Sequence, residues 1–465
     1  MRFSDAVTLT LALLGPTAAE VALPATQNKR PPIVLVSLDT LRADCLGRTA
    51  ADGRPLMPNL KAFARESVTF TRATTPLPFT LPSHMSMLTG LEPVVHGVLG
   101  NKTTLPEHID TLAELLHRSG YATVGVVSNE WLEGGFGFSR GFDSYDRIPH
   151  GATCAPRVNE AAFSAVATLA AGPKPFFLFL HYNDAHCDFQ TIETNTLPYL
   201  AAPETRHALG ADDATASFCD DKGTCACAFL LAADREKRVI PPERIAALLA
   251  CYHAGVRQLD TDLAALFSRL KALRVFDRSL IIVTSDHGEE FREHGLFLHS
   301  QPYQETIAVP LLVKLPGGRR SGARRDGLVS IADLTPTILD VADVPTGGRY
   351  QGSSLLPTID KGAAVHHEIV SRDKLRKQRW ALQTARHKLV WDEATGRLEL
   401  YDLGADPDER KNLAGKSPAM AATLRDRLGR LVAEQRRLAT ATPQTTGPVL
   451  SLEQMELLKS IGYLQ

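Results

Sequence analysis

Short runs of apolar residues, rich in β-branched and aromatic types, recur along the first 285 residues of the chain. These runs cover residues 33–38, 122–127, 176–180 and 280–285, and their length and continuous apolar character are typical of strands buried on both faces. Between them, apolar residues recur with helical spacing, for example over residues 111–116 and 259–273. Strands that alternate with helices predict an α/β fold with a mainly parallel sheet flanked by helices.

Polar residues follow each of the four predicted strands. They are Asp39 after the first, Ser128 and Asn129 after the second, His181, Asp184 and His186 after the third, and Asp286 and His287 after the fourth. In parallel α/β sheets, ligands bind beyond the carboxyl ends of the strands. The four strand ends therefore predict one functional site.

The pattern changes after about residue 345. Residues 380–384, 388–391 and 398–403 are short strand-like runs separated by turn residues, and they predict an antiparallel meander. A helix over 419–438 and a shorter one over 452–464 follow. We therefore expect a catalytic domain over 30–345 and a C-terminal α+β subdomain over 346–465.

Two segments depart from this organisation. Residues 1–24 carry one arginine, an apolar run from Ala6 to Leu14 and small residues, which predicts a signal peptide, with a short buried helix as the alternative. We therefore expect a secreted or periplasmic protein with no integral membrane segment after signal removal. Residues 188–235 are polar and rich in cysteine, and they predict an insertion near the site or a lid.

Composition and cysteine content bear on which partners the protein binds and on whether its compartment is oxidising. The 465 residues are 44% hydrophobic, enough for a large core, and carry a formal net charge of −1, so nucleic acid is not an expected partner. The seven cysteines leave at least one unpaired. Cys219, Cys225 and Cys227 lie close together and could form a disulfide in an oxidising compartment or, alternatively, bind a metal.

Asp39, Asp286 and His287 have the donor types that a divalent cation prefers. Two carboxylates and one imidazole predict a site for one ion, which could be calcium, magnesium, manganese or zinc. Each residue alone could equally be a hydrogen-bonded buried polar group.

Thr80 lies in the stretch PLPFTLPSHMSMLTG, just before a proline that suits the first turn of a helix. Its hydroxyl could cap that helix. Alternatively, the helix N-terminus and a neighbouring cation could lower its pKa and make it a nucleophile, in which case Thr80 would also contact the metal.

Several longer stretches resemble one known family. The runs SLDTLRADCLG, TLPSHMSMLTGLEPVVHG, FFLFLHYNDAH, TSDHGEEFREHG and YQETIAVPLLVKLPG, followed by ELYDLGADPDERKNLA and LKSIGYL, resemble in sequence and order the sulfatase family of the alkaline phosphatase superfamily. The resemblance covers residues 30–465. It implies an alkaline-phosphatase-like parallel sheet with a small C-terminal antiparallel sheet and helix.

The resemblance also implies roles for individual residues. Asp39, Asp286 and His287 match the family's metal ligands, Thr80 matches the position of the nucleophile, and His186 matches the histidine that handles a proton of the leaving group or intermediate. His299 falls where many members carry a lysine that contacts the ester oxygens, and a histidine could donate there only in a suitable protonation state.

The nucleophile segment departs from the pattern of sulfatases that use formylglycine. Those enzymes oxidise the first residue of C-x-P-S-R or its serine version, whereas this chain has Thr80, which could give only a ketone, and His84 in place of the arginine. Thr80 instead resembles the nucleophile of relatives that attack phosphorus directly. In such hydrolases an asparagine contacts the ester oxygen 21 residues later, and Asn101 meets that interval (101 − 80 = 21), although it could equally be a turn residue.

The resemblance implies a metal-dependent hydrolase of sulfate or phosphate esters, including phosphodiesters and phosphonate monoesters. Thr80 would attack, and a phospho- or sulfo-threonine would form before water releases the product. The expected substrate is an ester of a small molecule, a saccharide or a lipid head group. The alternatives are a catalytically inactive binding protein of this family and a phosphoryl-group transferase.

Overall fold

The computed structural model describes residues 30–50, 53–149, 154–187, 226–345, 350–374, 378–440 and 445–446. The predicted signal peptide, the tail helix over 452–464 and residues 188–225 of the predicted insertion lie outside the described residues. The boundary expected at residue 346 also falls on undescribed residues, 346–349, and stays a prediction.

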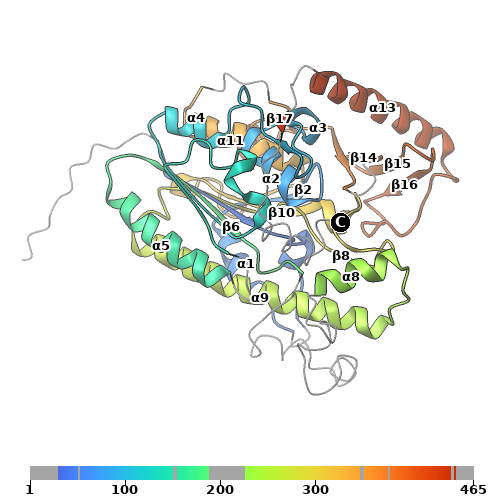
Figure 1. Cartoon of the computed structure of the whole chain (residues 1–465), viewed down its shortest axis with the longest axis horizontal. Coiled ribbons are helices and arrows are strands. Elements are labelled where there is room, and N and C mark those ends of the chain that lie inside the picture. Colours follow the sequence, from blue (N-terminus) through green and yellow to red (C-terminus); the bar gives the residue numbers. More distant parts are fainter. Residues whose placement is uncertain are drawn as a thin grey trace, which may run out of the picture.

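A nine-stranded central sheet organises the described residues (Figure 1). Its order is β11-β2-β10-β7-β1-β6-β4-β5, with β12 also paired to β2. The strands are β1 (Ile33–Leu38), β2 (Val68–Thr74), β4 (Ala122–Val127), β5 (Ser144–Arg147), β6 (Phe176–Tyr182), β7 (Leu280–Thr284), β10 (Ala308–Lys314), β11 (Arg324–Arg325) and β12 (Val329–Ser330). Only β10 runs antiparallel to its neighbours β7 and β2, so the prediction of a mainly parallel sheet is confirmed.

The central strands explain why their sequences are continuously apolar. β1 lies between β6 and β7, and every residue of these three strands is buried. A strand covered by helices on both faces has no solvent-facing side and therefore no polar alternation. The predicted ranges 33–38 and 122–127 coincide with β1 and β4.

Helices cover both faces of the sheet (Figure 1). One layer contains α1 (Pro58–Arg65), α5 (Ala155–Ala171) and α9 (Pro242–Ala272), and the other contains α2 (Thr80–Thr89), α4 (Leu112–Arg118) and α11 (Leu334–Val341). Shorter elements complete the domain: α3 (Pro93–His96), α8 (Ala226–Arg235), α10 (Gln304–Ile307), α12 (Leu356–Lys361), β3 (Thr103–Thr104), β8 (Glu290–Phe291), β9 (Phe297–Leu298) and β17 (Thr445–Thr446). The helix predicted over 259–273 is only the second half of α9, which begins at Pro242.

The C-terminal region forms the expected small antiparallel sheet with a helix against it (Figure 1). Its elements are β13 (Glu368–Arg372), β14 (Arg379–Thr384), β15 (His387–Asp392), β16 (Leu398–Asp402) and α13 (Pro418–Thr440). Apolar side chains of the sheet, including Trp380, Leu389 and Leu400, pack with Leu428 and Val432 of α13 in a core separate from that of the large domain.

This C-terminal sheet is hydrogen-bonded to the segment that precedes α2. The hydroxyl of Ser371 donates to the carbonyl of Thr75 at 2.9 Å, and the amide of Arg372 donates to the carbonyl of Pro76 at 2.9 Å. The contact places the end of β13 next to the loop that leads into Thr80.

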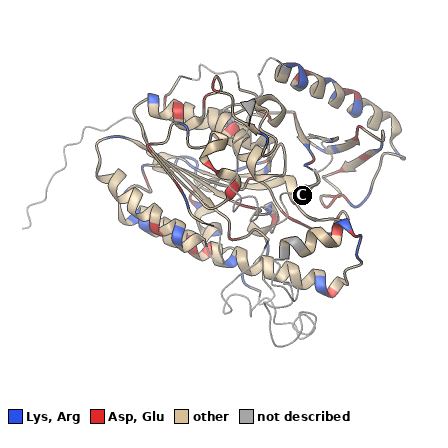
Figure 2. Cartoon of the chain, viewed as in Figure 1, with Lys and Arg blue, Asp and Glu red and all other residues tan. Residues whose placement is uncertain are grey.

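Charged residues of both signs are intermixed on the outer helices, as α5 and α9 show (Figure 2). The intermixing agrees with the formal net charge of −1. The exclusion of nucleic acid as a partner stays a prediction. Among the described residues, the longest apolar helical stretches fall short of what a membrane crossing requires.

Candidate active site

Three predicted metal-ligating residues meet at the carboxyl ends of neighbouring strands. Asp39 follows β1, and Asp286 and His287 follow β7. His287 Nε2 lies 3.3 Å from Asp286 Oδ2 and 3.8 Å from Asp39 Oδ1, and all three residues are buried. The structure thus brings together the donors that the sequence places almost 250 residues apart.

The lone pairs of the three predicted metal-ligating side chains point toward a common centre. His287 Nδ1 lies 3.0 Å from the carbonyl of Gly288, a contact that requires a proton on Nδ1 and leaves a lone pair on Nε2. Asp39 Oδ1 and Asp286 Oδ2 are buried and accept no hydrogen bond from the described residues. Buried acceptors that converge in this way fit a divalent cation, and their oxygen and imidazole types suit it chemically.

The pKa values of the cluster follow from burial and mutual proximity. Burial and the charge of Asp39 raise the pKa of Asp286 well above its ordinary value. Burial also opposes ionisation of Asp39, but a hydrogen bond from His181 and the nearby His186 hold its pKa below the ordinary value. Burial lowers the pKa of His287 to about 4, so its imidazole is neutral at pH 7 and able to bind a metal.

Thr80 is the first residue of α2, and its hydroxyl points at this cluster. Thr80 Oγ1 lies 3.4 Å from His287 Nε2. Phe79, with extended backbone angles (φ −159°, ψ 130°), occupies the N-cap position. The alternative in which the Thr80 side chain caps the helix is therefore wrong, because the hydroxyl faces the predicted metal ligands instead.

Two side chains of α2 hold Thr80 in place. Ser83 Oγ donates to the carbonyl of Asp286 at 2.6 Å. His84 Nδ1 donates to the carbonyl of Thr80 at 2.8 Å, and its Nε2 lies 2.8 Å from the hydroxyl of Ser37 on β1. Because burial lowers the pKa of His84 to about 3, its imidazole is neutral, and this geometry indicates a positioning role for the predicted site residue His84.

The loops that carry the acidic residues depend on unusual backbone conformations. Thr40 has a left-handed φ of 56°, with its amide 3.3 Å from Asp286 Oδ1 and its carbonyl accepting from the hydroxyl of Tyr252 at 2.9 Å. At Gly288, a Cβ atom would lie 2.0 Å from the carbonyl oxygen of Glu305. Only glycine permits this close approach of the loop after β7.

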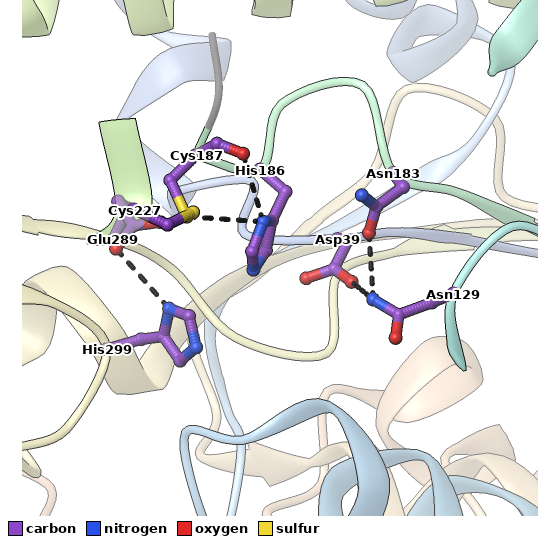
Figure 3. The surroundings of a disulfide bond; sticks show 8 residues. All are labelled: Asp39, Asn129, Asn183, His186, Cys187, Cys227, Glu289 and His299. Atoms are coloured by element: carbon purple, nitrogen blue, oxygen red, sulfur yellow. Dashed lines mark hydrogen bonds and ion pairs between the residues drawn. A yellow bond between two sulfur atoms is a disulfide. The ribbon is translucent and has the colours of Figure 1, made fainter. Parts of the chain in front are cut away.

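His186 follows β6, and a disulfide lies directly beside it (Figure 3). His186 Nδ1 is 3.2 Å from the carbonyl of Cys187. Cys187 pairs with Cys227 of α8, 40 residues further along the chain. Cys227 thus pairs with a cysteine outside its own cluster, whereas Cys219 and Cys225 lie outside the described residues and a disulfide between them stays a prediction.

We expect Cys227→Ser to lower turnover because loss of the disulfide frees the segment that orients His186. A small displacement of a proton donor costs roughly 10- to 100-fold in rate. Opening a 40-residue loop also lowers the free energy of unfolding by roughly 4 kcal/mol. Initial rates and denaturant unfolding measure the two effects, with Cys251→Ser, at a buried unpaired cysteine, as the control. Unchanged turnover in a destabilised Cys227→Ser protein would show that His186 does not depend on the disulfide.

His299 reaches the cluster from the segment after β9. Its ring stacks on that of His287, with centroids 4.2 Å apart, and its Nδ1 lies 3.3 Å from Glu289 Oε1 (Figure 3). Burial lowers the pKa of His299 well below its ordinary value, and burial together with Asp39 raises that of Glu289 well above it. The role of His299 toward an ester stays a prediction.

Two neighbours of Asp39 had no role assigned from the sequence. Asn129 Nδ2 donates to Asp39 Oδ2 at 2.9 Å and lies 2.8 Å from Asn183 Oδ1 (Figure 3), and His181 Nε2 lies 3.3 Å from the same Asp39 oxygen. These contacts satisfy Oδ2 and leave Oδ1 for the cluster. The sequence placed both residues directly after predicted strands, which marked them as candidate site residues. Only the strand order β1-β6-β4 shows that they lie beside Asp39.

Asn101 lies in the turn between α3 and β3 and is half-buried. Within the described ranges, its side chain makes no hydrogen bond to Thr80 or to the metal-ligand cluster. An oxyanion role for Asn101 stays a prediction.

Two other clusters of side chains could in principle bind a metal, but their members already have protein partners. Cys187 and Cys227 beside His186 are joined in the disulfide and cannot bind as thiolates. Glu409, which lies near His294 and Glu305, already has Lys388 Nζ at 2.8 Å, with both side chains fully buried.

Comparison with protein families places the whole described chain among known proteins. The model of the family described as Sulfatase matches residues 31–344, and that described as N-sulphoglucosamine sulphohydrolase, C-terminal, matches residues 292–436. Arylsulfatase K of Xenopus laevis is 24% identical over 450 residues, which cover 87% of this chain and 83% of the relative. The multifunctional alkaline phosphatase superfamily protein PehA of Trinickia caryophylli is 26% identical over 486 residues, which cover 85% of this chain and 93% of the relative.

Solved structures confirm the predicted fold class. A phosphonate monoester hydrolase of Agrobacterium radiobacter superposes with a TM-score of 0.67 at 21% identity, covering 87% of this chain and 96% of that one. A protein solved in complex with its substrate D-glucosamine-2-N,6-O-disulfate superposes with a TM-score of 0.70 at 19% identity, covering 89% and 98%. The fold is thus alkaline-phosphatase-like, with the small C-terminal antiparallel sheet.

Proposed function

Since the chain belongs to the sulfatase family and is a sulfatase-like ester hydrolase, we propose that it cleaves sulfate or phosphate-type esters with Thr80 as nucleophile and one divalent cation as cofactor. The observation that carries this proposal is the position of Thr80 Oγ1, 3.4 Å from His287 Nε2 and therefore beside Asp39 and Asp286. Asp39, Asp286 and His287 would hold the cation together with the Thr80 oxygen.

When bound, the cation would lower the pKa of the Thr80 hydroxyl and withdraw charge from the ester oxygens. The protein itself supplies the orientation of the nucleophile. Ser83 and His84 fix the first turn of α2, so that Oγ1 is directed at the reacting centre. The N-terminus of α2 adds a positive field that favours the alkoxide.

His186 would carry the proton of the leaving group. Thr80 Oγ1, whose proton would pass to solvent, would form a bond to sulfur or phosphorus, while the bond to the leaving oxygen breaks and His186 protonates that oxygen. Water then attacks the phospho- or sulfo-threonine, His186 accepts a proton from it, and Thr80 is released. His299 would donate a hydrogen bond to the ester through Nε2.

The class of substrate follows from the family and its structural neighbours. One neighbour binds a disulfated glucosamine, and another is a phosphonate monoester hydrolase. We therefore propose an anionic ester of a small molecule, a saccharide or a lipid head group. The Cys187–Cys227 disulfide supports an oxidising compartment and thus a secreted or periplasmic location.

Turnover of a matched series of p-nitrophenyl esters tests the proposal. The sulfate, the phosphate monoester, a phosphodiester and a phosphonate monoester are compared with chelator and after each metal is restored. We expect one ester class to be cleaved in a metal-dependent manner, and its identity decides between sulfur and phosphorus chemistry. Absence of turnover by folded, metal-loaded protein would contradict the proposal and favour a non-catalytic binding protein.

A further inference from the structure

Lys374, from the C-terminal subdomain, lies between two segments of the active site. It follows β13, and its backbone amide donates to the carbonyl of Ser300 at 3.1 Å, next to His299. Its Nζ lies 3.9 Å from the centroid of the Phe79 ring, and Phe79 immediately precedes Thr80. The ammonium group thus lies beside the residue that precedes Thr80, the proposed nucleophile.

The loop that carries Lys374 is anchored on both sides. The amide of Arg372 donates to the carbonyl of Pro76 at 2.9 Å, and the guanidinium of Arg379 donates to Gln301 Oε1 at 2.5 Å. Asp373 Oδ1 accepts from the amide of Arg379 at 3.2 Å and closes the turn. These contacts orient the lysine before any substrate binds.

Lys374 is also part of the electrostatics of the cluster. Burial lowers the pKa of Lys374 to about 7, although Glu289 and Asp39 counteract this effect. Its charge in turn helps to lower the pKa values of His287 and His299. An anionic ester beside the ammonium group favours its charged form.

A sulfate or phosphonate ester carries negative charge, and a cationic side chain beside the buried site can stabilise that charge. An ammonium group is a point charge that binds such oxygens without strict geometry, and the Phe79 ring holds it by a cation–π contact.

We propose that Lys374 binds the non-bridging oxygens of the ester that Thr80 attacks, so that the C-terminal subdomain completes the active site. The inference rests on the proposed function of this site and adds a substrate-binding residue to it. The competing explanation is structural, with Lys374 serving only to offset Asp39 and Glu289.

Binding of inorganic sulfate and phosphate separates these explanations. We expect Lys374→Met to weaken inhibition by both anions about 10- to 100-fold and to raise KM by a similar factor, because a hydrogen bond to a charged group is lost. Inhibition by p-nitroanisole, an uncharged analogue of the aryl half of the ester, is expected to stay unchanged. Lys374→Arg keeps the charge and should restore part of the anion binding, and Lys416→Met, at an exposed lysine of the same subdomain, is the control.

If Lys374 only stabilised the folded site, its replacement would not weaken anion binding selectively. Lys374→Met with unaltered anion inhibition, or with anion and p-nitroanisole inhibition weakened equally, overturns the inference. Calorimetric titration of Thr80→Ala protein with sulfate and phosphate gives a readout that needs no turnover. If the wild type cleaves no ester but these anions bind in a Lys374-dependent manner, the proposed function fails and Lys374 is an anion-binding residue of a non-catalytic site. If the wild type cleaves an ester but anion binding does not depend on Lys374, the proposed function stands and the inference about Lys374 fails.

Discussion

Thr80→Ala is expected to abolish ester hydrolysis and to leave the fold in place. The substitution removes the oxygen that lies 3.4 Å from His287 Nε2, whereas Asp39, Asp286 and His287 all remain. Loss of a nucleophile in enzymes that form a covalent intermediate lowers kcat on the order of 10⁴-fold or more. Steady-state rates on the preferred p-nitrophenyl ester, with circular dichroism as a test of folding, measure the effect.

Two variants of the same helix make this experiment specific. Thr80→Ser keeps a hydroxyl at the position and should retain turnover. Thr89→Ala removes a hydroxyl that donates to the carbonyl of Met85 at 2.7 Å, at the opposite end of α2, and should also remain active. Mass spectrometry of acid-quenched wild type should find the transferred group on the peptide that contains Thr80. Full activity of Thr80→Ala would refute the nucleophile assignment.

Asp286→Asn is expected to remove the bound metal and, with it, most of the activity. The asparagine can preserve the hydrogen bonds that Oδ1 accepts from the amides of Thr40 and His287, at 3.3 and 2.9 Å. The atom that replaces Oδ2, however, is an amide nitrogen with protons where the cation needs an electron pair. A catalytic cation contributes several kcal/mol to transition-state stabilisation, so the rate should fall on the order of 10³-fold.

Metal content, measured by elemental analysis of the purified protein, checks this expectation directly. Asp260→Asn is a matched control, because Asp260 is also buried and accepts hydrogen bonds from two backbone amides, those of Asn59 and Leu60. Asp260 lies on α9, outside the cluster, and its replacement should leave the metal content unchanged. A normal metal content in Asp286→Asn would show that Asp286 is not a metal ligand and that the cation binds elsewhere than at the end of β7.

The fold was predictable because its information is local. Continuous apolar runs identified β1, β4, β6 and β7, since strands in the interior of a sheet covered on both faces are mostly apolar along their length. The turn-separated runs after residue 345 likewise indicated the small sheet of β14, β15 and β16. The start of α9 at Pro242 was not predicted from the sequence.

Much of the site was also predictable, because parallel strands deliver the residues after them to one edge of the sheet. Asp39, Asp286, His287 and His186 could be placed on this basis, and the family resemblance added Thr80. No local pattern could show that Asn129 and His181 contact Asp39, or that Glu289 lies against His299. These relations depend on strand order and burial, which are properties of the assembled sheet.

The sequence by itself thus determined the mainly parallel sheet, the site at the carboxyl ends of its strands and the kinds of side chain that follow those strands. The reason is that hydrophobic periodicity and residue chemistry can be read from the sequence without the fold. Only the tertiary structure decided which distant groups complete the site. Cys227 pairs with Cys187, and Lys374 reaches Phe79, through the packing of α8 and of the C-terminal sheet against the large domain. Such contacts join segments that fold as separate local units, and their geometry exists only once those units are packed together.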